Sequence, residues 1–136
     1  MNDQTHIANL VKRHFRDVDD FFSRKIGIEQ LVSVFKEDAI RTRGNVSCVG
    51  LDSIKQSFLK QRDEVLSMKH KMKRLAVIVK DTDASATLEW TVALKRKDGK
   101  LRRYSGFDAF EFNKVDSNWK IAKILIMAHG GYLGFR

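Results

Sequence analysis

Asp108 is the residue in this sequence that most strongly suggests chemistry. It lies in Gly106-Phe107-Asp108-Ala109-Phe110-Glu111-Phe112, where strand alternation puts it on the same face as Phe110 and Phe112. A carboxylate on an apolar face needs a partner, or its pKa rises until it is neutral. Such a neutral acid can donate a hydrogen bond to a developing oxyanion. The alternative is a structural aspartate held by an arginine or by backbone amides.

His14 is a second polar group among apolar neighbours. It falls between Leu10 and Val18 on the apolar stripe of a helix predicted for Asp3–Phe22. A histidine there is either a buried structural side chain or a polar group directed into a cavity. Its unperturbed pKa of about 6.5 would suit an acid or a base. Together, His14 and Asp108 suggest a cofactor-independent cyclase, isomerase or dehydratase that acts on a small apolar carbonyl compound.

Two arginines share one face of a short strand predicted for Ala39–Arg43. Alternation places Arg41 and Arg43 on the same side of this strand. If that side lines a pocket, its mouth is cationic and suits a ligand with an apolar body and a carboxylate. Alternatively, both arginines are solvated at the rim or paired with an acid.

The sequence shows no motif for a metal or a phosphate. His6, His14, His70 and His129 share no ligand spacing, so no metal site is expected. Gly130-Gly131 lacks a following Lys-Ser or Lys-Thr and is not a phosphate loop. We therefore expect no cofactor. The single cysteine, Cys48, cannot form an internal disulfide and is expected in a loop as an inert small hydrophobe.

Composition predicts one globular domain over residues 1–136, with 43% hydrophobic and 32% charged residues. No apolar run approaches the roughly 20 residues of a membrane span, and the polar start is unlike a signal peptide. We expect a cytoplasmic protein with no membrane segment. The net charge of +9 raises nucleic acid as a partner. It is not the expected partner, because the basic residues are scattered and Lys69–Arg74 lacks interleaved aromatic residues.

Residues 84–128 organise the predicted fold as an antiparallel meander with tight turns. Its strands are Ser85–Arg96, Lys100–Asn113 and Asn118–Ala128. The last strand is apolar on both faces, with Ile121 assigned to the face of Lys123 and Leu125. Helices would cover one face, and a second subunit would cover the other, which predicts a homodimer through the outer sheet face.

The residues upstream of the meander are predicted to form helices that cover the sheet. After the first helix, helices are expected at Ile28–Phe35 and Leu51–Leu66, and a strand at Leu75–Val79. Ser67–Arg74 is expected to be a basic, polar connection.

The order of these elements, together with four short stretches, resembles the nuclear transport factor 2-like superfamily. This superfamily includes the SnoaL-like polyketide cyclases and the ketosteroid isomerases. The stretches are Gly27-Ile28-Glu29-Gln30-Leu31-Val32-Ser33-Val34-Phe35-Lys36-Glu37-Asp38-Ala39, Gly50-Leu51-Asp52-Ser53-Ile54, Leu88-Glu89-Trp90 and Asp108-Ala109-Phe110-Glu111-Phe112. The resemblance implies an α+β, cystatin-like fold. In it, a cone-shaped, strongly bent, mostly antiparallel sheet wraps a long N-terminal helix and encloses a deep apolar pocket. Such domains usually dimerise through the outer sheet face.

The resemblance also implies roles for single residues. Asp108 matches the pocket carboxylic acid of the isomerases, and His14 falls where they have a pocket tyrosine. Arg43 falls where they have the catalytic aspartate base, and an arginine cannot abstract a proton. Steroid isomerisation by that base is therefore not expected. The predicted ligand-binding residues are Arg41, Arg43, Trp90, Tyr104, Phe110, Ile124 and Ala128. The alternative function is a non-catalytic dimeric module that binds a ligand or a protein.

Overall fold

The computed structural model describes residues 2–129 as three helices that pack against one six-stranded sheet. Gly130-Gly131 lies outside the described residues. The elements are α1 (Asp3–Phe22), α2 (Ile28–Val32), β1 (Phe35–Arg43), β2 (Val46–Val49), α3 (Leu51–Arg62), β3 (Val65–Lys80), β4 (Asp83–Arg96), β5 (Leu101–Val115) and β6 (Asn118–Ala128).

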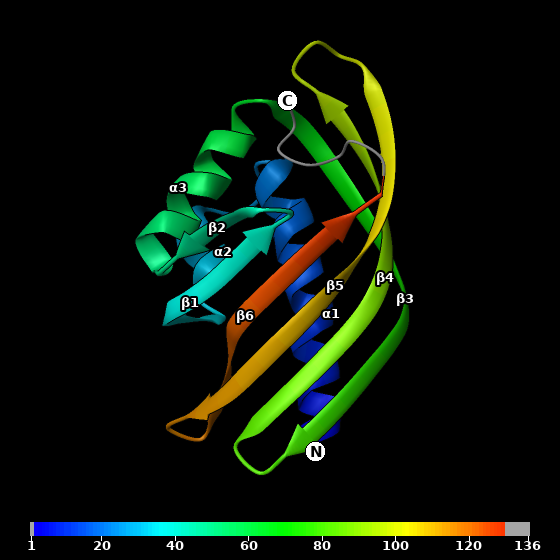
Figure 1. Cartoon of the computed structure of the whole chain (residues 1–136). Coiled ribbons are helices and arrows are strands. Elements are labelled where there is room, and N and C mark those ends of the chain that lie inside the picture. Colours follow the sequence, from blue (N-terminus) through cyan, green and yellow to red (C-terminus); the bar gives the residue numbers. More distant parts are fainter. Residues whose placement is uncertain (1, 130–136) are drawn as a thin grey trace.

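The strands lie in the order β2-β1-β6-β5-β4-β3. Every neighbouring pair is antiparallel except β1 with β6, which is parallel. The long strands bend around α1, and α2 and α3 lie beside β1 and β2 at one end of the sheet (Figure 1). The predicted fold is confirmed: a strongly bent, mostly antiparallel sheet wraps the long N-terminal helix.

Helix α1 has the bounds that the sequence predicts. The side chain of Asn2 caps its start by accepting a hydrogen bond from the backbone N–H of Thr5 at 2.8 Å. The apolar stripe from Ile7 to Phe21 is buried against the sheet. After the helix, Arg24 adopts a φ of 63° and turns the chain away.

Both other helices are shorter than predicted, because strand pairing competes with helical periodicity. Helix α2 ends at Val32, and Phe35 already pairs with Ile121 of β6. Helix α3 ends at Arg62, and β3 begins at Val65. Apolar side chains near these ends face the core from a strand rather than from a helix.

The prediction of a connection over Ser67–Arg74 is wrong, because these residues belong to β3 and pair with β4. A β-bulge with Arg74 at a φ of 57° divides this strand. Cys48 is likewise in a strand, β2, where it pairs with Arg41. A β-bulge at Ala122 turns Ile121 into the core, so its predicted place on the face of Lys123 and Leu125 is also wrong.

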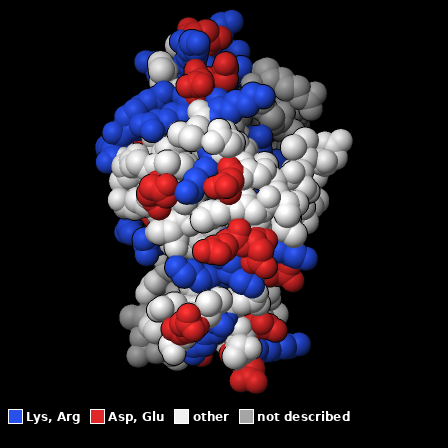
Figure 2. Space-filling view, turned by 90° about the vertical axis from the view of Figure 1, so that its left-hand side faces the viewer, with Lys and Arg blue, Asp and Glu red and all other residues white. Residues whose placement is uncertain are grey.

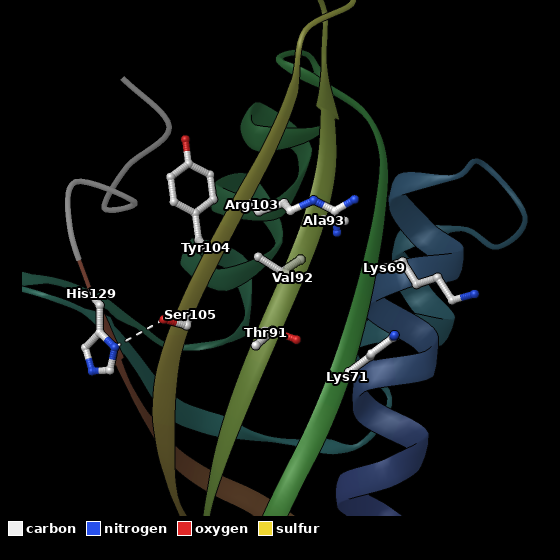
Figure 3. Close-up of a pocket in the computed structure, with 9 residues that line it drawn as sticks. All are labelled: Lys69, Lys71, Thr91, Val92, Ala93, Arg103, Tyr104, Ser105 and His129. Atoms are coloured by element: carbon white, nitrogen blue, oxygen red, sulfur yellow. Dashed lines mark hydrogen bonds between the residues drawn. The ribbon is translucent and has the colours of Figure 1, made fainter.

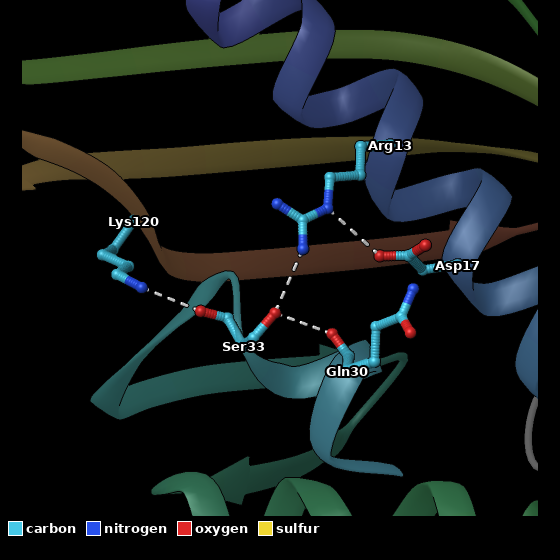
Figure 4. A network of polar contacts seen from close by, with 5 residues as sticks. All are labelled: Arg13, Asp17, Gln30, Ser33 and Lys120. Carbon is cyan, nitrogen blue, oxygen red and sulfur yellow. Dashed lines mark hydrogen bonds and ion pairs between the residues drawn. The ribbon is translucent and has the colours of Figure 1, made fainter. Parts of the chain in front are cut away.

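A polar network joins α1 to α2 and β6 (Figure 4). Arg13 contacts the buried carboxylate of Asp17 at 3.4 Å and donates to the Ser33 hydroxyl at 3.3 Å. That hydroxyl donates to the carbonyl of Gln30 at 2.7 Å, and Lys120 donates to the carbonyl of Ser33 at 2.8 Å. The network ties the end of α2 to both neighbouring elements.

Candidate functional site

A cavity of about 30 Å³ lies between α1, α3 and the inner face of the sheet. It has room for a water molecule or two, whereas ligand pockets usually measure roughly 300–1,000 Å³. Large side chains fill the space where the resemblance implies a deep pocket. The residues that line the cavity are His14, Phe15, Val18, Phe22, Arg41, Gln61, Met68, His70, Trp90, Asp108 and Ile126.

Asp108 faces this cavity from β5 and is only 4% exposed. Its carboxylate accepts a hydrogen bond from the indole N–H of Trp90 at 2.8 Å. Burial raises the pKa of Asp108 to about 6, although the Trp90 hydrogen bond and then the nearby His70 and Arg41 oppose the rise. Asp108 therefore titrates close to neutral pH, where a group can both take up and release a proton.

Gly106 makes the Trp90–Asp108 contact possible. A Cβ atom at this position would lie 2.5 Å from the indole ring and 2.4 Å from the carbonyl oxygen of Met127. Only glycine leaves room for the ring to lie over the strand. This role of Gly106 was not predicted from the sequence. A glycine in the interior of a predicted strand can indicate such a close approach.

His14 lies on the α1 side of the same cavity and is 5% exposed. The rings of Phe35 and Phe110 meet it edge-on at centroid distances of 5.5 and 5.9 Å. Within residues 2–129, its Nδ1 atom has no hydrogen-bond partner. Burial, followed by the charges of Arg41 and His70, lowers the pKa of His14 to about 3. The imidazole is therefore neutral at pH 7.

His70 and Asp19 form a pair that the sequence analysis did not anticipate. One carboxylate oxygen of Asp19 accepts from the backbone N–H of His70 at 2.8 Å, and the other lies 2.6 Å from Nδ1 of the ring. The contact favours the tautomer with the proton on Nδ1 and leaves Nε2 as the proton acceptor. The alternation Met68-Lys69-His70-Lys71-Met72 was the available signal, because it puts histidine on the apolar face of a strand.

The two arginines reach different places. Arg41 is buried, lines the cavity and stacks its guanidinium over Phe58 at 4.2 Å. Arg43 is half-buried and donates to the side-chain oxygen of Gln61 at 3.3 Å when that amide is turned toward it. Gln61 itself lines the cavity, whereas Arg43 does not, so Arg43 is connected to the cavity through Gln61.

The structure brings together only some of the other residues predicted to bind ligand. Trp90 lines the cavity, and Phe110 contacts its wall through His14. Ile124 is buried in the surrounding core, and Ala128 is half-buried and packs against that core. Tyr104 does not line this cavity: it is half-buried against the core beside Val92 and contributes to the lining of a separate hollow.

Other classes of site are not prominent in the described part of the chain. Within residues 2–129, no three His, Cys, Asp or Glu side chains are grouped as metal ligands. None of the helices there is long and apolar enough to cross a bilayer. On the side formed by α3 and β2, acidic side chains are interspersed with Lys and Arg, which gather toward the top of the view (Figure 2).

The profile of the SnoaL-like domain matches residues 1–124. The chain belongs to the SnoaL-like domain family. No protein of curated function matches this SnoaL-like domain. The match confirms the family resemblance that the sequence suggested.

Solved structures similar to this SnoaL-like domain share its fold over nearly their full length. A candidate aromatic ring hydroxylase from Novosphingobium aromaticivorans is 23% identical, with 94% of this chain and 90% of that one covered and a TM-score of 0.84. A nuclear transport factor 2-like superfamily protein from Salmonella enterica is 16% identical over 95% and 92%, with a TM-score of 0.79. A candidate scytalone dehydratase from Novosphingobium aromaticivorans is 17% identical over 96% and 89%, with a TM-score of 0.77.

Proposed function

We propose that this SnoaL-like domain is a cofactor-independent enzyme that transfers protons on a small apolar carbonyl compound, as an isomerase, cyclase or dehydratase does. The observation that carries the proposal is the convergence of His70, held by Asp19, with Asp108 on one cavity. Ionisable groups in shielded, shifted environments mark sites of acid–base chemistry.

His70 is the base in this proposal. Its Nε2 atom takes a proton from carbon next to the substrate carbonyl, and the Asp19 carboxylate stabilises the imidazolium that forms. Asp108, with a pKa of about 6, then gives a proton to the leaving or rearranged group. The steroid isomerases have a carboxylate base at the position of Arg43, and this chain has none there. In this proposal, His70 on β3 acts as the base instead.

Arg41 and His14 stabilise the substrate in this proposal. The Arg41 guanidinium is a fixed cation in a shielded site, where it would favour a developing enolate oxygen. The same charge would favour a ligand that carries a carboxylate. His14 stays neutral and offers hydrogen bonds rather than a mobile proton, because its pKa is about 3.

The proposal requires the cavity to open, since about 30 Å³ cannot hold a ring-sized substrate. A surface groove of about 650 Å³ runs between α1 and β3 and shares Phe15, Met68 and His70 with the cavity. Met68 is unbranched and changes rotamer readily. Rotation of Met68 and Phe15 would join the groove to the cavity beside His70.

One of the similar structures supports this class of chemistry, because it is named as a candidate scytalone dehydratase and loss of water requires proton transfer. Another is named as a candidate aromatic ring hydroxylase, a different reaction, and supports only a ring-shaped substrate. At identities of 17% and 23%, these likenesses extend to the fold alone. They make aromatic and partly reduced ring ketones reasonable first probes.

Proton transfer can be tested without knowing the natural substrate. Incubation with 2-tetralone in D₂O, followed by NMR, measures exchange of the protons next to the carbonyl. Incubation with scytalone measures loss of water by absorbance. We expect exchange or dehydration above the buffer rate, and we expect His70→Gln to abolish it. Equal rates for wild type, His70→Gln and buffer would contradict the proposal.

The alternative is a non-catalytic module that binds a ligand or a protein, and the small cavity volume favours it. A similar fold occurs in a candidate calcium/calmodulin-dependent protein kinase II association domain from Xanthomonas campestris, with a TM-score of 0.78. Native mass spectrometry separates the two functions. A co-purified small molecule that is released unchanged, with no exchange on any probe, supports the alternative.

Dimerisation through the outer sheet face is part of the proposal. Leu125 and Met127 of β6 are 39% and 46% exposed on that face. Apolar side chains in such a position are commonly covered by a partner. We expect a homodimer in sedimentation equilibrium and a monomer for Met127→Glu. A monomeric wild type would contradict this part of the proposal.

A further inference from the structure

A second hollow, of about 830 Å³, lies on the outer side of β3, β4 and β5, across the sheet from the cavity. Its floor is made of small residues, and long basic side chains stand around it. The residues that line it are Lys69, Lys71, Thr91, Val92, Ala93, Arg103, Tyr104, Ser105 and His129. The groove of the acid–base proposal shares Lys69 and Ala93 with this hollow, but the proposed chemistry uses neither side chain.

Strand register arranges these residues in two neighbouring rows. In one row, Lys69 pairs with Ala93, and Ala93 pairs with Arg103. In the other, Lys71 pairs with Thr91, and Thr91 pairs with Ser105. With strands about 4.8 Å apart, the first row places cationic side chains about 10 Å apart across a small central residue. Figure 3 shows Arg103 lying across β4 toward β3, and Lys69 and Lys71 extending outward from β3.

The far side of the hollow adds polar groups. Ser105 contacts Nδ1 of His129 at 3.2 Å (Figure 3). The Ser105 and Thr91 hydroxyls offer hydrogen bonds at the floor of the hollow. Tyr104 pairs with the buried Val92 and packs against the core, so the hollow combines cationic walls with a polar floor.

The charge of the hollow is uncompensated within the described part of the chain. No acidic residue is among the lining residues, and Lys69, Lys71 and Arg103 form no ion pair within residues 2–129. Two other basic residues on the outer face are paired with acids: Arg74 with Glu89 at 2.6 Å, and Lys123 with Glu111 at 3.7 Å. Three neighbouring cations that lack an acid attract an anion from solution.

We propose that this hollow binds a small phosphate-bearing ligand, with the phosphate oxygens between Arg103 and the two lysines. Arginine matches phosphate with a fork of donors, and lysine adds a compact positive charge. Three cations spread over two rows fit a diphosphate better than a single carboxylate. The proposal does not depend on the proposed proton-transfer chemistry.

Isothermal titration calorimetry with inorganic pyrophosphate and with ADP tests the proposal. We expect both to bind the wild type, ADP through its diphosphate group. Arg103→Ala and Lys71→Ala should each weaken pyrophosphate binding by at least tenfold. Lys123→Ala is the matched control: it removes a lysine from the same outer face, but one already paired with an acid, and should bind as wild type does.

Three results would overturn the proposal. One is no heat of binding for either ligand at millimolar concentration. Another is an equal loss of binding in Lys123→Ala, since that would indicate a diffuse charge effect. The third is a single-stranded 20-mer DNA that binds far more tightly than ADP with a steep salt dependence, which would identify a nucleic-acid surface. Far-UV circular dichroism of each variant checks that binding is lost without loss of the fold.

Discussion

Two polar regions meet on α1, and they differ in whether their polar atoms have hydrogen-bond partners. In the network of Figure 4, the carboxylate of Asp17 and the hydroxyl of Ser33 have hydrogen-bond or ionic partners. One turn away, Nδ1 of His14 has no hydrogen-bond partner within residues 2–129, and its pKa falls to about 3. Polar groups that join elements are satisfied, whereas groups left with shifted pKa values cost free energy of folding. Such a cost is typical of a site kept for ligand or catalysis.

The largest expected effect is on catalysis. If the cavity is an active site, His70→Gln should lower the rate of proton exchange by ~100- to 10,000-fold, the usual contribution of a general base. Asp19→Asn should lower kcat in the same direction with little change in KM, because Asp19 orients His70 and does not touch the substrate. His6→Gln, on the exposed start of α1, is the control. Unchanged rates in His70→Gln and Asp19→Asn would indicate that the cavity, like the network of Figure 4, has only a structural role.

The next effect is the pH dependence that His14 imposes on stability. Its folded pKa of about 3 lies below the unfolded value of 6.5, so only the unfolded chain gains a proton as the pH falls through this window. Between pH 7 and pH 4, this titration by itself costs about 3 kcal/mol of stability. In urea unfolding, His14→Leu should therefore gain about 3 kcal/mol relative to wild type as the pH falls from 7 to 4, whereas His6→Gln should follow wild type. Parallel curves for His14→Leu and wild type would contradict the assigned pKa.

Asp108 should give the opposite slope. Its folded pKa of about 6 exceeds the unfolded value of 3.8, so stability falls as the pH rises from about 4 to about 6. The loss is about 3 kcal/mol at pH 7 and should be absent in Asp108→Asn. In wild type the slopes of His14 and Asp108 nearly cancel between pH 4 and pH 6, so only the single variants reveal them. A slope of the same sign in both variants would be inconsistent with this pair of shifts.

The smallest effect belongs to the satisfied network. Ser33→Ala removes one hydroxyl that accepts from Arg13 and donates to Gln30. We expect a loss of about 0.5–1 kcal/mol in the free energy of unfolding, which is the usual net value of a hydrogen bond. The loss should be equal at pH 5 and pH 8 and should leave proton exchange unchanged. A pH-dependent loss would mean that the network is coupled to the cavity.

The sequence predicts those parts of the fold whose periodicity is local. The stripe of α1 and the alternation in β4 to β6 are visible in neighbouring residues, and both were confirmed except at Ile121, where the bulge in β6 changes the face. Strand β3 was missed between Ser67 and Arg74, because lysines on its solvent face read as a polar connection. Strand β2 was missed because it depends on pairing with β1, and no local sequence pattern indicates that pairing.

The candidate site was predictable only where one residue stood out by itself. Asp108 and His14 were found because each is polar on an apolar stripe, and both do line one cavity. The pair of His70 and Asp19 joins residues 51 positions apart. It exists only once β3 is in register beside α1, so residue type and spacing could not reveal it. The proposed roles of all four residues stay predictions until activity is measured.

Strand β3 has a consequence for how this chain can change in length. Successive side chains of the strand look to opposite sides, so His70 points to the interior while Lys69 and Lys71 point to the outer hollow. Inserting or deleting one residue just before them would exchange the two sides, burying lysines and exposing the histidine. Relatives should therefore tolerate length variation in the β3–β4 turn, beyond the bulge at Arg74, and conserve length between α3 and His70.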